Sequence, residues 1–139
     1  MRTLEQERAH YAWTRVKAVN EGDKGTANDV AMYLKGMPAM VLSNGLGQSL
    51  AFMLSKAKGN QADAHNIVYD MIAEWLVDKR NVYGGSKAEL MLAIIEGDRA
   101  IYQQAQGETW ALLVWLKKFA DAYIRPGAAG ADRRTGGKG

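Results

Sequence analysis

Glu7 and His10 have the residue types and the spacing that a metal site on a helix requires. A Glu-x-x-His pair supplies part of a di-iron carboxylate centre in helical bundles, because residues three apart lie on the same helix face. Such a centre needs a second pair, and His65 has no Glu three residues before it. We therefore interpret Glu7 and His10 as surface residues and expect neither a metal nor a cofactor.

An acidic stripe runs through the second half of the chain at helical spacing. Its members are Asp63, Asp70, Glu74 and Asp78. The opposite side of the same segment is apolar, so a solvated helix face explains the stripe without a ligand. The alternative is contact with the basic surface of a partner subunit, which we favour over a divalent metal.

No constellation in the sequence predicts nucleophilic or acid–base catalysis. The chain has no cysteine and only two histidines. Gly84, Gly85 and Ser86 resemble part of a nucleophile elbow, but residue 88 is alanine and no predicted strand precedes them. Residues 22–26 have Lys and Gly in the wrong order for a phosphate-binding loop. We expect a protein that is not an enzyme and has no catalytic residues.

Positive charge is concentrated towards the two ends of the sequence. Residues 1–59 contain eight Lys and Arg against five Asp and Glu, whereas residues 60–124 contain six against nine. The chain thus has a basic first half and an acidic second half before its basic end. Arg8 and Arg15 stand seven residues apart and share one helix face. Either they pair with acidic neighbours or they line a groove that holds phosphates, and the spacing leaves both open.

Capping residues and helix breakers divide the chain into about six helical segments. The predicted starts are Thr3, Thr26, Pro38, Asn60, Ser86 and Asp98. Gly36 and Gly97 are predicted to end helices, and Gly107 is a candidate break within the last one. Apolar residues at helical spacing are assigned to the core, among them Leu42, Ile95 and Trp110. No stretch alternates with period two for long enough to form a strand.

Residues 44–48, with the sequence Asn-Gly-Leu-Gly-Gln, place two glycines inside a predicted helix. Each glycine costs roughly 1 kcal/mol relative to alanine in a helix interior, so a bend or a close approach to the backbone must compensate. Tight packing between helices is one explanation. The other is that Asn44 and Gln48 are exposed amides that contact a partner, or ribose and phosphate.

These features predict an all-α fold, a single compact bundle of about five to six helices over residues 1–125. Residues 126–139 are rich in Gly, Ala and Arg and are expected to form a flexible, disordered tail. The longest apolar run, residues 110–116, is too short to cross a bilayer, and the N-terminus has no apolar signal region. We therefore expect a cytoplasmic protein without membrane contact.

One segment resembles the signature of a known protein family. Residues 35–52 read KGMPAMVLSNGLGQSLAF and are similar to the small α-helical subunit of type III-B CRISPR effector complexes, the Cmr type. Residues 8–16 and 115–120 are also similar to that family, so the resemblance covers most of residues 4–124. The motif residues, which we assign to subunit contact or to structure, are Pro38, Asn44, Gly45, Gly47 and Gln48.

The resemblance implies a non-catalytic protein within a ribonucleoprotein that serves antiviral defence. Several copies would stack beside the backbone subunits that hold the guide RNA, in a complex that also has a large subunit. Together they would form the groove for the guide RNA–target RNA duplex, with contacts to phosphate and sugar because base pairing reads the sequence. The candidate RNA-binding residues are Arg8, Arg15, Lys17, Lys35, Lys56 and Lys58.

Two other classes of protein remain as alternatives. A helical DNA-binding protein would need a recognition helix rich in basic and amide side chains, and the helix predicted from Pro38 is too apolar for that. A metal-binding bundle would need further inward-pointing ligands besides Glu7 and His10.

Overall fold

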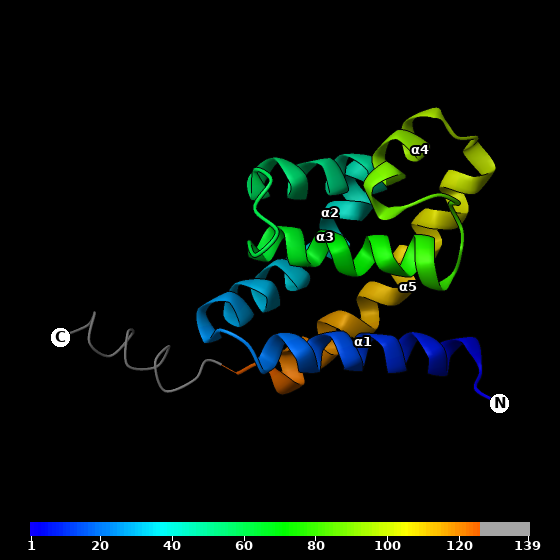
Figure 1. Cartoon of the computed structure of the whole chain (residues 1–139). Helices are drawn as coiled ribbons and strands as arrows, with labels where there is room; N and C mark the ends of the chain where they lie inside the picture. Colours follow the sequence, from blue (N-terminus) through cyan, green and yellow to red (C-terminus); the bar gives the residue numbers. More distant parts are fainter. Residues whose placement is uncertain (126–139) are drawn as a thin grey trace.

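A computed structural model describes residues 1–125, and every regular element in this range is helical (Figure 1). The five α-helices are α1 (Leu4–Asn20), α2 (Lys24–Ala57), α3 (Ala64–Glu74), α4 (Leu90–Glu96) and α5 (Arg99–Tyr123). A π-helical turn, η1 (Trp75–Lys79), extends α3, and a 3₁₀ turn, η2 (Lys87–Glu89), precedes α4. The predicted all-α fold is confirmed. The tail predicted for residues 126–139 lies outside the described residues.

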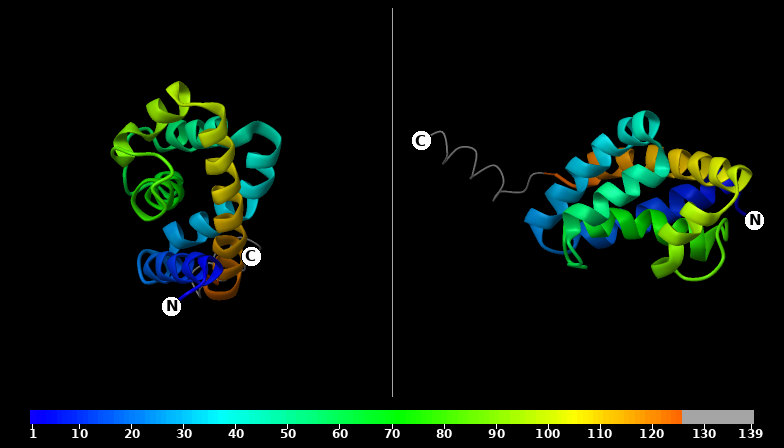
Figure 2. Two further views of the ribbon diagram at one scale, coloured as in Figure 1. Left: turned by 90° about the vertical axis from the view of Figure 1, so that its right-hand side faces the viewer. Right: turned by 90° about the horizontal axis from the view of Figure 1, so that it is seen from above.

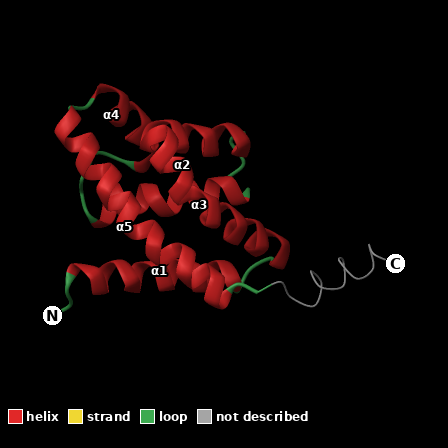
Figure 3. Ribbon diagram, turned by 180° about the vertical axis from the view of Figure 1, so that it is seen from behind, coloured by secondary structure: helices red, strands yellow, loops and turns green. Residues whose placement is uncertain are grey.

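The helices pack around one core. α2 contacts both α3 and α5, and α5 contacts α1. Figure 2 shows α5 running the height of the molecule, from α4 at one end to α1 at the other, and Figure 3 shows the helices from behind, joined by loops. Each α-helix contributes fully buried side chains, for example Val16, Leu34, Met71, Leu90 and Leu113. None of the helices in residues 1–125 is both long and apolar enough to span a bilayer.

Three of the predicted helix starts are confirmed by their caps. The Thr3 hydroxyl accepts a hydrogen bond from the Gln6 amide at 3.1 Å, and the Gln6 side chain accepts from the Thr3 amide at 2.8 Å. The other two confirmed caps are Asp98 at α5 and the Ser86–Glu89 capping box at η2. Local hydrogen bonding of this kind is visible in the sequence, because cap and partner stand only three residues apart.

Two predicted starts lie at the wrong residue. α2 begins after Asp23, whose carboxylate accepts from the Thr26 amide at 2.8 Å, so Thr26 lies in the first turn and is not the cap. α3 begins after Asp63, which accepts from the His65 amide at 2.7 Å, rather than near Asn60. In both cases an aspartate takes the cap, because its carboxylate satisfies free amides and faces the positive end of the helix dipole.

The predicted break at Gly36 and Pro38 is wrong, because α2 continues through both residues. A proline inside a helix costs about 3 kcal/mol, since it removes one hydrogen bond and crowds the preceding turn. A buried stripe formed by Leu34, Met37 and Val41 spans this site, and each of its side chains is at most 2 % exposed. Continuous packing of the stripe against the core therefore outweighs the local signal.

Three residues assigned to the core lie on the surface. Leu42, Ile95 and Trp110 have 76 %, 72 % and 39 % of their surface exposed. The predicted break at Gly107 is absent, so α5 keeps one helical phase along its length. The buried face of its second half contains Leu112, Leu113, Leu116 and Ala120. Trp110 lies outside this face, because the helical period of 3.6 residues does not align it with these four buried positions.

Candidate functional site

The glycine motif is a break in α2. Gly45 has φ +84° and ψ 164°, far from helical values, and the helix resumes directly after it. Two amides at the start of the second half of α2 donate hydrogen bonds to side chains of α5. The Leu46 amide donates to the Gln106 side-chain oxygen at 2.9 Å, and the Gly47 amide donates to the Tyr102 hydroxyl at 2.9 Å. α5 thus caps the second half of α2 in the middle of the fold.

The backbone of this break requires glycine at Gly45, whereas a Cβ on Gly47 would make only ordinary van der Waals contact. The φ of Gly45 lies in a region that favours glycine, and a Cβ there would lie 3.1 Å from the Tyr102 hydroxyl. A Cβ on Gly47 would lie 3.4 Å from an Ile94 methyl group. Asn44 and Gln48 are at the surface on either side, and their contact with a partner or RNA stays a prediction. Pro38 is half-buried within the first half of α2.

Arg8 lies in an ion-pair cluster with a buried carboxylate. Its guanidinium bonds to Glu5 at 2.8 Å and to Glu108 at 3.3 Å. Glu108, whose side chain is 9 % exposed, also pairs with Arg80 at 3.4 Å and accepts the Trp75 indole N–H at 3.2 Å. These contacts join α1, η1 and α5. For Arg8, the structure therefore shows pairing with acidic neighbours, one of the two arrangements that its spacing left open.

Arg15 also pairs with carboxylates, about two turns further along α1. Its guanidinium bonds to Glu74 at 2.7 Å, to Asp70 at 3.2 Å and to the Tyr11 hydroxyl at 3.0 Å. Burial opposes ionisation of Glu74, but hydrogen bonds from Tyr11 and Arg15 outweigh it and hold the pKa of this carboxyl below its ordinary value. Two members of the acidic stripe therefore face α1, which corrects the expectation of a solvated face for Asp70 and Glu74.

The remaining acidic residues do not form a metal site. Asp63 caps α3, and Asp78 is exposed. Within residues 1–125, no group of three or more His, Asp or Glu side chains is arranged to hold a metal ion. Glu7 and His10 are both exposed on α1.

Four of the candidate RNA-binding residues are exposed lysines, namely Lys17, Lys35, Lys56 and Lys58. None of them takes part in an ion pair within the described part of the chain. Lys17 lies over the Trp13 ring at 5.1 Å, and Lys56 lies over the Phe52 ring at 5.5 Å. Lys58 is the left-handed C-cap of α2. Their ammonium groups are available to an anionic ligand.

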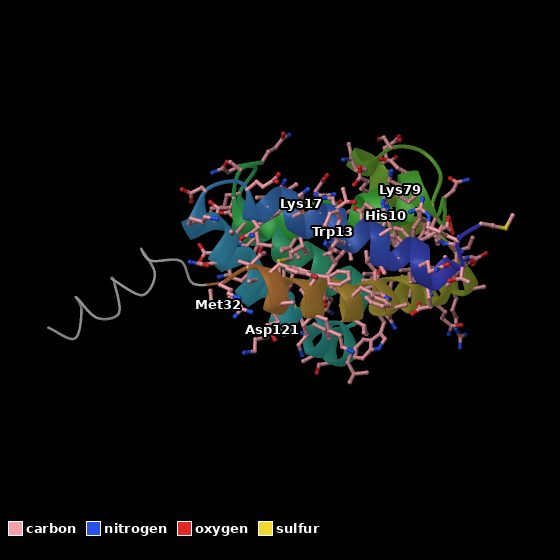
Figure 4. All side chains as sticks on the ribbon, turned by 90° about the horizontal axis from the view of Figure 1, so that it is seen from below. His10, Trp13, Lys17, Met32, Lys79 and Asp121 are labelled. Carbon is pink, nitrogen blue, oxygen red and sulfur yellow. The ribbon has the colours of Figure 1, made fainter. Side chains whose placement is uncertain are left out.

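Lys35 lies in a groove between α2 and α5, which we call the lysine groove. Its volume is about 420 Å³, and its lining residues are Ala31, Met32, Lys35, Lys117, Lys118, Ala120, Asp121 and Ile124. Three lysines thus face one carboxylate over an apolar floor. Met32 and Asp121 mark the groove in Figure 4.

Sequence reasoning missed Lys117 and Lys118, which were not among the candidate RNA-binding residues. Their adjacency in the sequence is a visible signal of local positive charge. Their proximity to Lys35 is not visible there, because it depends on how α5 crosses α2. In the lysine groove, the sequence-predicted candidate Lys35 thus gains two further cations.

Comparisons with known proteins agree with one another. The family model "CRISPR-associated protein (Cas_Cmr5)" matches residues 4–123. The CRISPR system Cmr subunit Cmr5 of Thermus thermophilus is 31 % identical over 125 residues, which are 89 % of this chain and 98 % of the relative. The crystal structure of a CRISPR-associated Cmr5 family protein, also from Thermus thermophilus, superposes with a TM-score of 0.68 at 28 % identity, covering 90 % of this chain and 100 % of that one.

Proposed function

The chain belongs to the Cmr5 family of CRISPR-associated proteins, and from this premise we propose that it is a non-catalytic small subunit of a type III-B CRISPR Cmr effector complex. Several copies stack beside the backbone subunits that hold the guide RNA, and the large subunit is a further partner. The stacked copies help to bind the guide RNA–target RNA duplex in antiviral defence. The proposal includes a cytoplasmic location.

The lysine groove is the observation that supports the RNA part of this proposal. It gathers Lys35, Lys117 and Lys118 against a single carboxylate, Asp121. Lysine ammonium groups bind backbone phosphates as point charges and release counterions from the nucleic acid. A protein that contacts a guide–target duplex needs this kind of contact, because shape and backbone are what it recognises.

The other exposed candidates extend the same proposal. Lys17, Lys56 and Lys58 supply further phosphate contacts, and the amides of Asn44 and Gln48 supply contacts to a partner or to ribose. Arg8 and Arg15 already bond to carboxylates of their own chain. Their contribution to RNA binding stays a prediction, and it would use the guanidinium N–H groups that these ion pairs leave over.

The charge distribution supports stacking between copies or with partner subunits. The basic surface of α2 and α5 could meet exposed acidic residues elsewhere on a neighbouring copy, such as Asp78 on η1, whereas Asp70 and Glu74 already pair with Arg15. Opposite charges on different faces favour a heterologous, head-to-tail contact over a twofold one.

Two experiments test the proposed function. The first recovers the tagged full-length protein from its native cells and identifies what accompanies it. Short guide RNAs together with backbone and large subunits are expected, and their absence would contradict the proposal. The second measures binding of target RNA by the reconstituted complex that carries Lys117→Glu/Lys118→Glu. We expect weaker binding and a salt dependence whose slope is smaller by about two.

The matched control for the second experiment is Lys24→Glu/Arg99→Glu. These residues are exposed outside the lysine groove, and the double variant changes the net charge by the same amount. Equal losses in the two double variants would indicate a general charge effect and would remove the groove from the proposed interface.

A further inference from the structure

The exposed side of α1 carries aromatic and basic side chains together. We call this surface the Trp13 face and define it by Arg2, His10, Trp13, Thr14, Lys17 and Lys79. Figure 4 shows four of these residues, His10, Trp13, Lys17 and Lys79, on one side of the molecule. The lysine groove lies between other elements, so the Trp13 face is a separate surface.

A groove of about 320 Å³ lies between α1 and η1 at one edge of this face. The basic side chains that line it are Arg2, His10, Lys79 and Arg80, and its one carboxylate is Glu7. Arg80 is paired with Glu108, whereas Arg2 and Lys79 take part in no ion pair found in residues 1–125. The groove therefore offers two uncommitted cations and an imidazole to an anion.

Trp13 does not line the groove itself but adjoins it at His10. His10 precedes it by three residues and so is its neighbour on the helix surface. The Trp13 side chain is 41 % exposed, although it is among the largest apolar side chains in the chain. The Lys17 ammonium lies 5.1 Å from the ring centroid, where it restrains the ring and adds positive charge beside it.

We propose that the Trp13 face binds unpaired RNA. One base stacks on the Trp13 ring, while the adjoining phosphates lie against Lys17, Lys79 and Arg2. This inference rests on the proposed function for the presence of RNA, but it concerns a single strand and not the duplex. An exposed ring on a convex helix requires a base that is free to leave its neighbours, and bases in a duplex are already stacked and paired.

The composition of the Trp13 face favours nucleic acid over a protein partner. Tryptophan is enriched at both kinds of interface, but lysine is depleted in protein–protein interfaces. Here lysine adjoins the ring directly, and a second lysine lines the neighbouring groove. Aromatic rings interleaved with cations are the recurring arrangement of single-strand binding surfaces.

The test uses the full chain and a labelled single-stranded oligoadenylate at low salt, with binding followed by fluorescence anisotropy. Trp13→Ala is expected to weaken binding roughly 5- to 150-fold, the usual effect of removing one stacking partner. Trp13→Phe keeps an aromatic ring and should restore most of the affinity. The matched control is Trp110→Ala, because Trp110 on α5 is exposed to almost the same extent, 39 %; its affinity should equal that of the unmodified chain.

A duplex of the same length provides the second comparison. The affinity of the chain for the duplex should not depend on Trp13. The inference is overturned if the chain fails to bind the single strand, if Trp13→Ala binds it normally, or if Trp110→Ala loses as much affinity. Loss of a partner subunit from the assembled complex in Trp13→Ala, with single-strand binding intact, would instead assign the face to protein. Recovery of guide RNA with the tagged protein does not depend on any of these results, so failure here leaves the proposed function standing.

Discussion

At the scale of single residues, Glu108 is a nearly buried carboxylate that three side chains contact. It is 8 % exposed overall, accepts hydrogen bonds from the Arg8 guanidinium and the Trp75 indole, and forms an ion pair with Arg80. We expect Glu108→Gln to lower the free energy of unfolding by about 2–3 kcal/mol, because it leaves Arg8 and Arg80 without their shared counter-charge in a largely buried place. Urea denaturation monitored by circular dichroism measures this change.

Glu96→Gln is the control for that variant. Glu96 is exposed at the end of α4 and makes no ion pair within residues 1–125. Its stability should stay within about 0.5 kcal/mol of the unmodified chain. A Glu108→Gln protein that is equally stable would show that the cluster contributes no net stability.

Glu74 makes stability depend on pH in the acid range. Its pKa in the folded chain is lowered from 4.5, despite the opposing effect of burial, by the bonds from Tyr11 and Arg15. Its stabilisation is therefore complete above the ordinary pKa and is lost as the pH falls through the lowered value. Unfolding measured in urea from pH 6 to pH 3 should show a steeper loss for the unmodified chain than for Glu74→Gln. Parallel curves for the two proteins would contradict this assignment.

The sequence predicted the residue contacts that are local and missed those that are distant. The Thr3–Gln6 cap is evident from a spacing of three residues. Glu108 was not singled out, because its partner Arg8 is 100 residues away and only the crossing of α1 and α5 brings them together. The spacing of Arg8 and Arg15 showed a shared face, but not that carboxylates face it.

At the scale of elements, the two glycines of α2 should respond oppositely to alanine. Gly45→Ala is expected to cost about 1–3 kcal/mol, because its φ of 84° and ψ of 164° lie in a region that is essentially restricted to glycine and its Cβ would meet the Tyr102 hydroxyl. Gly36→Ala is expected to add up to about 1 kcal/mol, since it lies within a continuous helix and its Cβ has open space. Thermal unfolding of both variants in one buffer tests the contrast. Similar effects of the two substitutions would exclude a special backbone role for Gly45.

The same helix shows where prediction of elements succeeded and where it failed. The two glycines at 45 and 47 correctly indicated a bend in the helix or a close approach to its backbone. Each glycine destabilises a helix interior, so a structural feature must compensate for it. Gly36 and Pro38 look like a stronger stop, yet the buried stripe through Met37 keeps the helix intact. A glycine or proline in the sequence indicates only the local free-energy cost of continuing a helix. The packing of α2 against α3 and α5, which offsets that cost, depends on the folded core.

At the scale of the whole molecule, the two proposed RNA-binding surfaces should differ in how strongly their affinity depends on salt. Lysines in the groove between α2 and α5 meet phosphates, so the affinity of the assembled complex for its duplex should fall with salt for every matched guide and target. Single-strand binding at Trp13 includes stacking, which is less sensitive to salt. Titrations of both RNAs over a salt series should give the steeper slope for the duplex, and the opposite order would contradict this division.

The overall class was predictable, whereas the surfaces were only partly so. Composition and periodicity were sufficient for an all-α bundle, because helix formers and apolar stripes are recorded along the chain. Lys35 was a candidate on charge alone, but the groove also needs Lys117 and Lys118 from a helix about 80 residues later. Surfaces built from two crossing helices follow from tertiary arrangement, which a single sequence does not display.

The joint at Gly45 has a mechanical consequence for those surfaces. Tyr102 and Gln106 of α5 accept hydrogen bonds from α2 directly after its break at Gly45. The angle between the two halves of α2 can therefore change only if these two hydrogen bonds break. Lys35 lies in the first half of α2 and Lys56 in the second. The break therefore fixes the distance between these two cations. An RNA that contacts both must have phosphates at a matching separation, because the protein does not adjust its shape to the ligand.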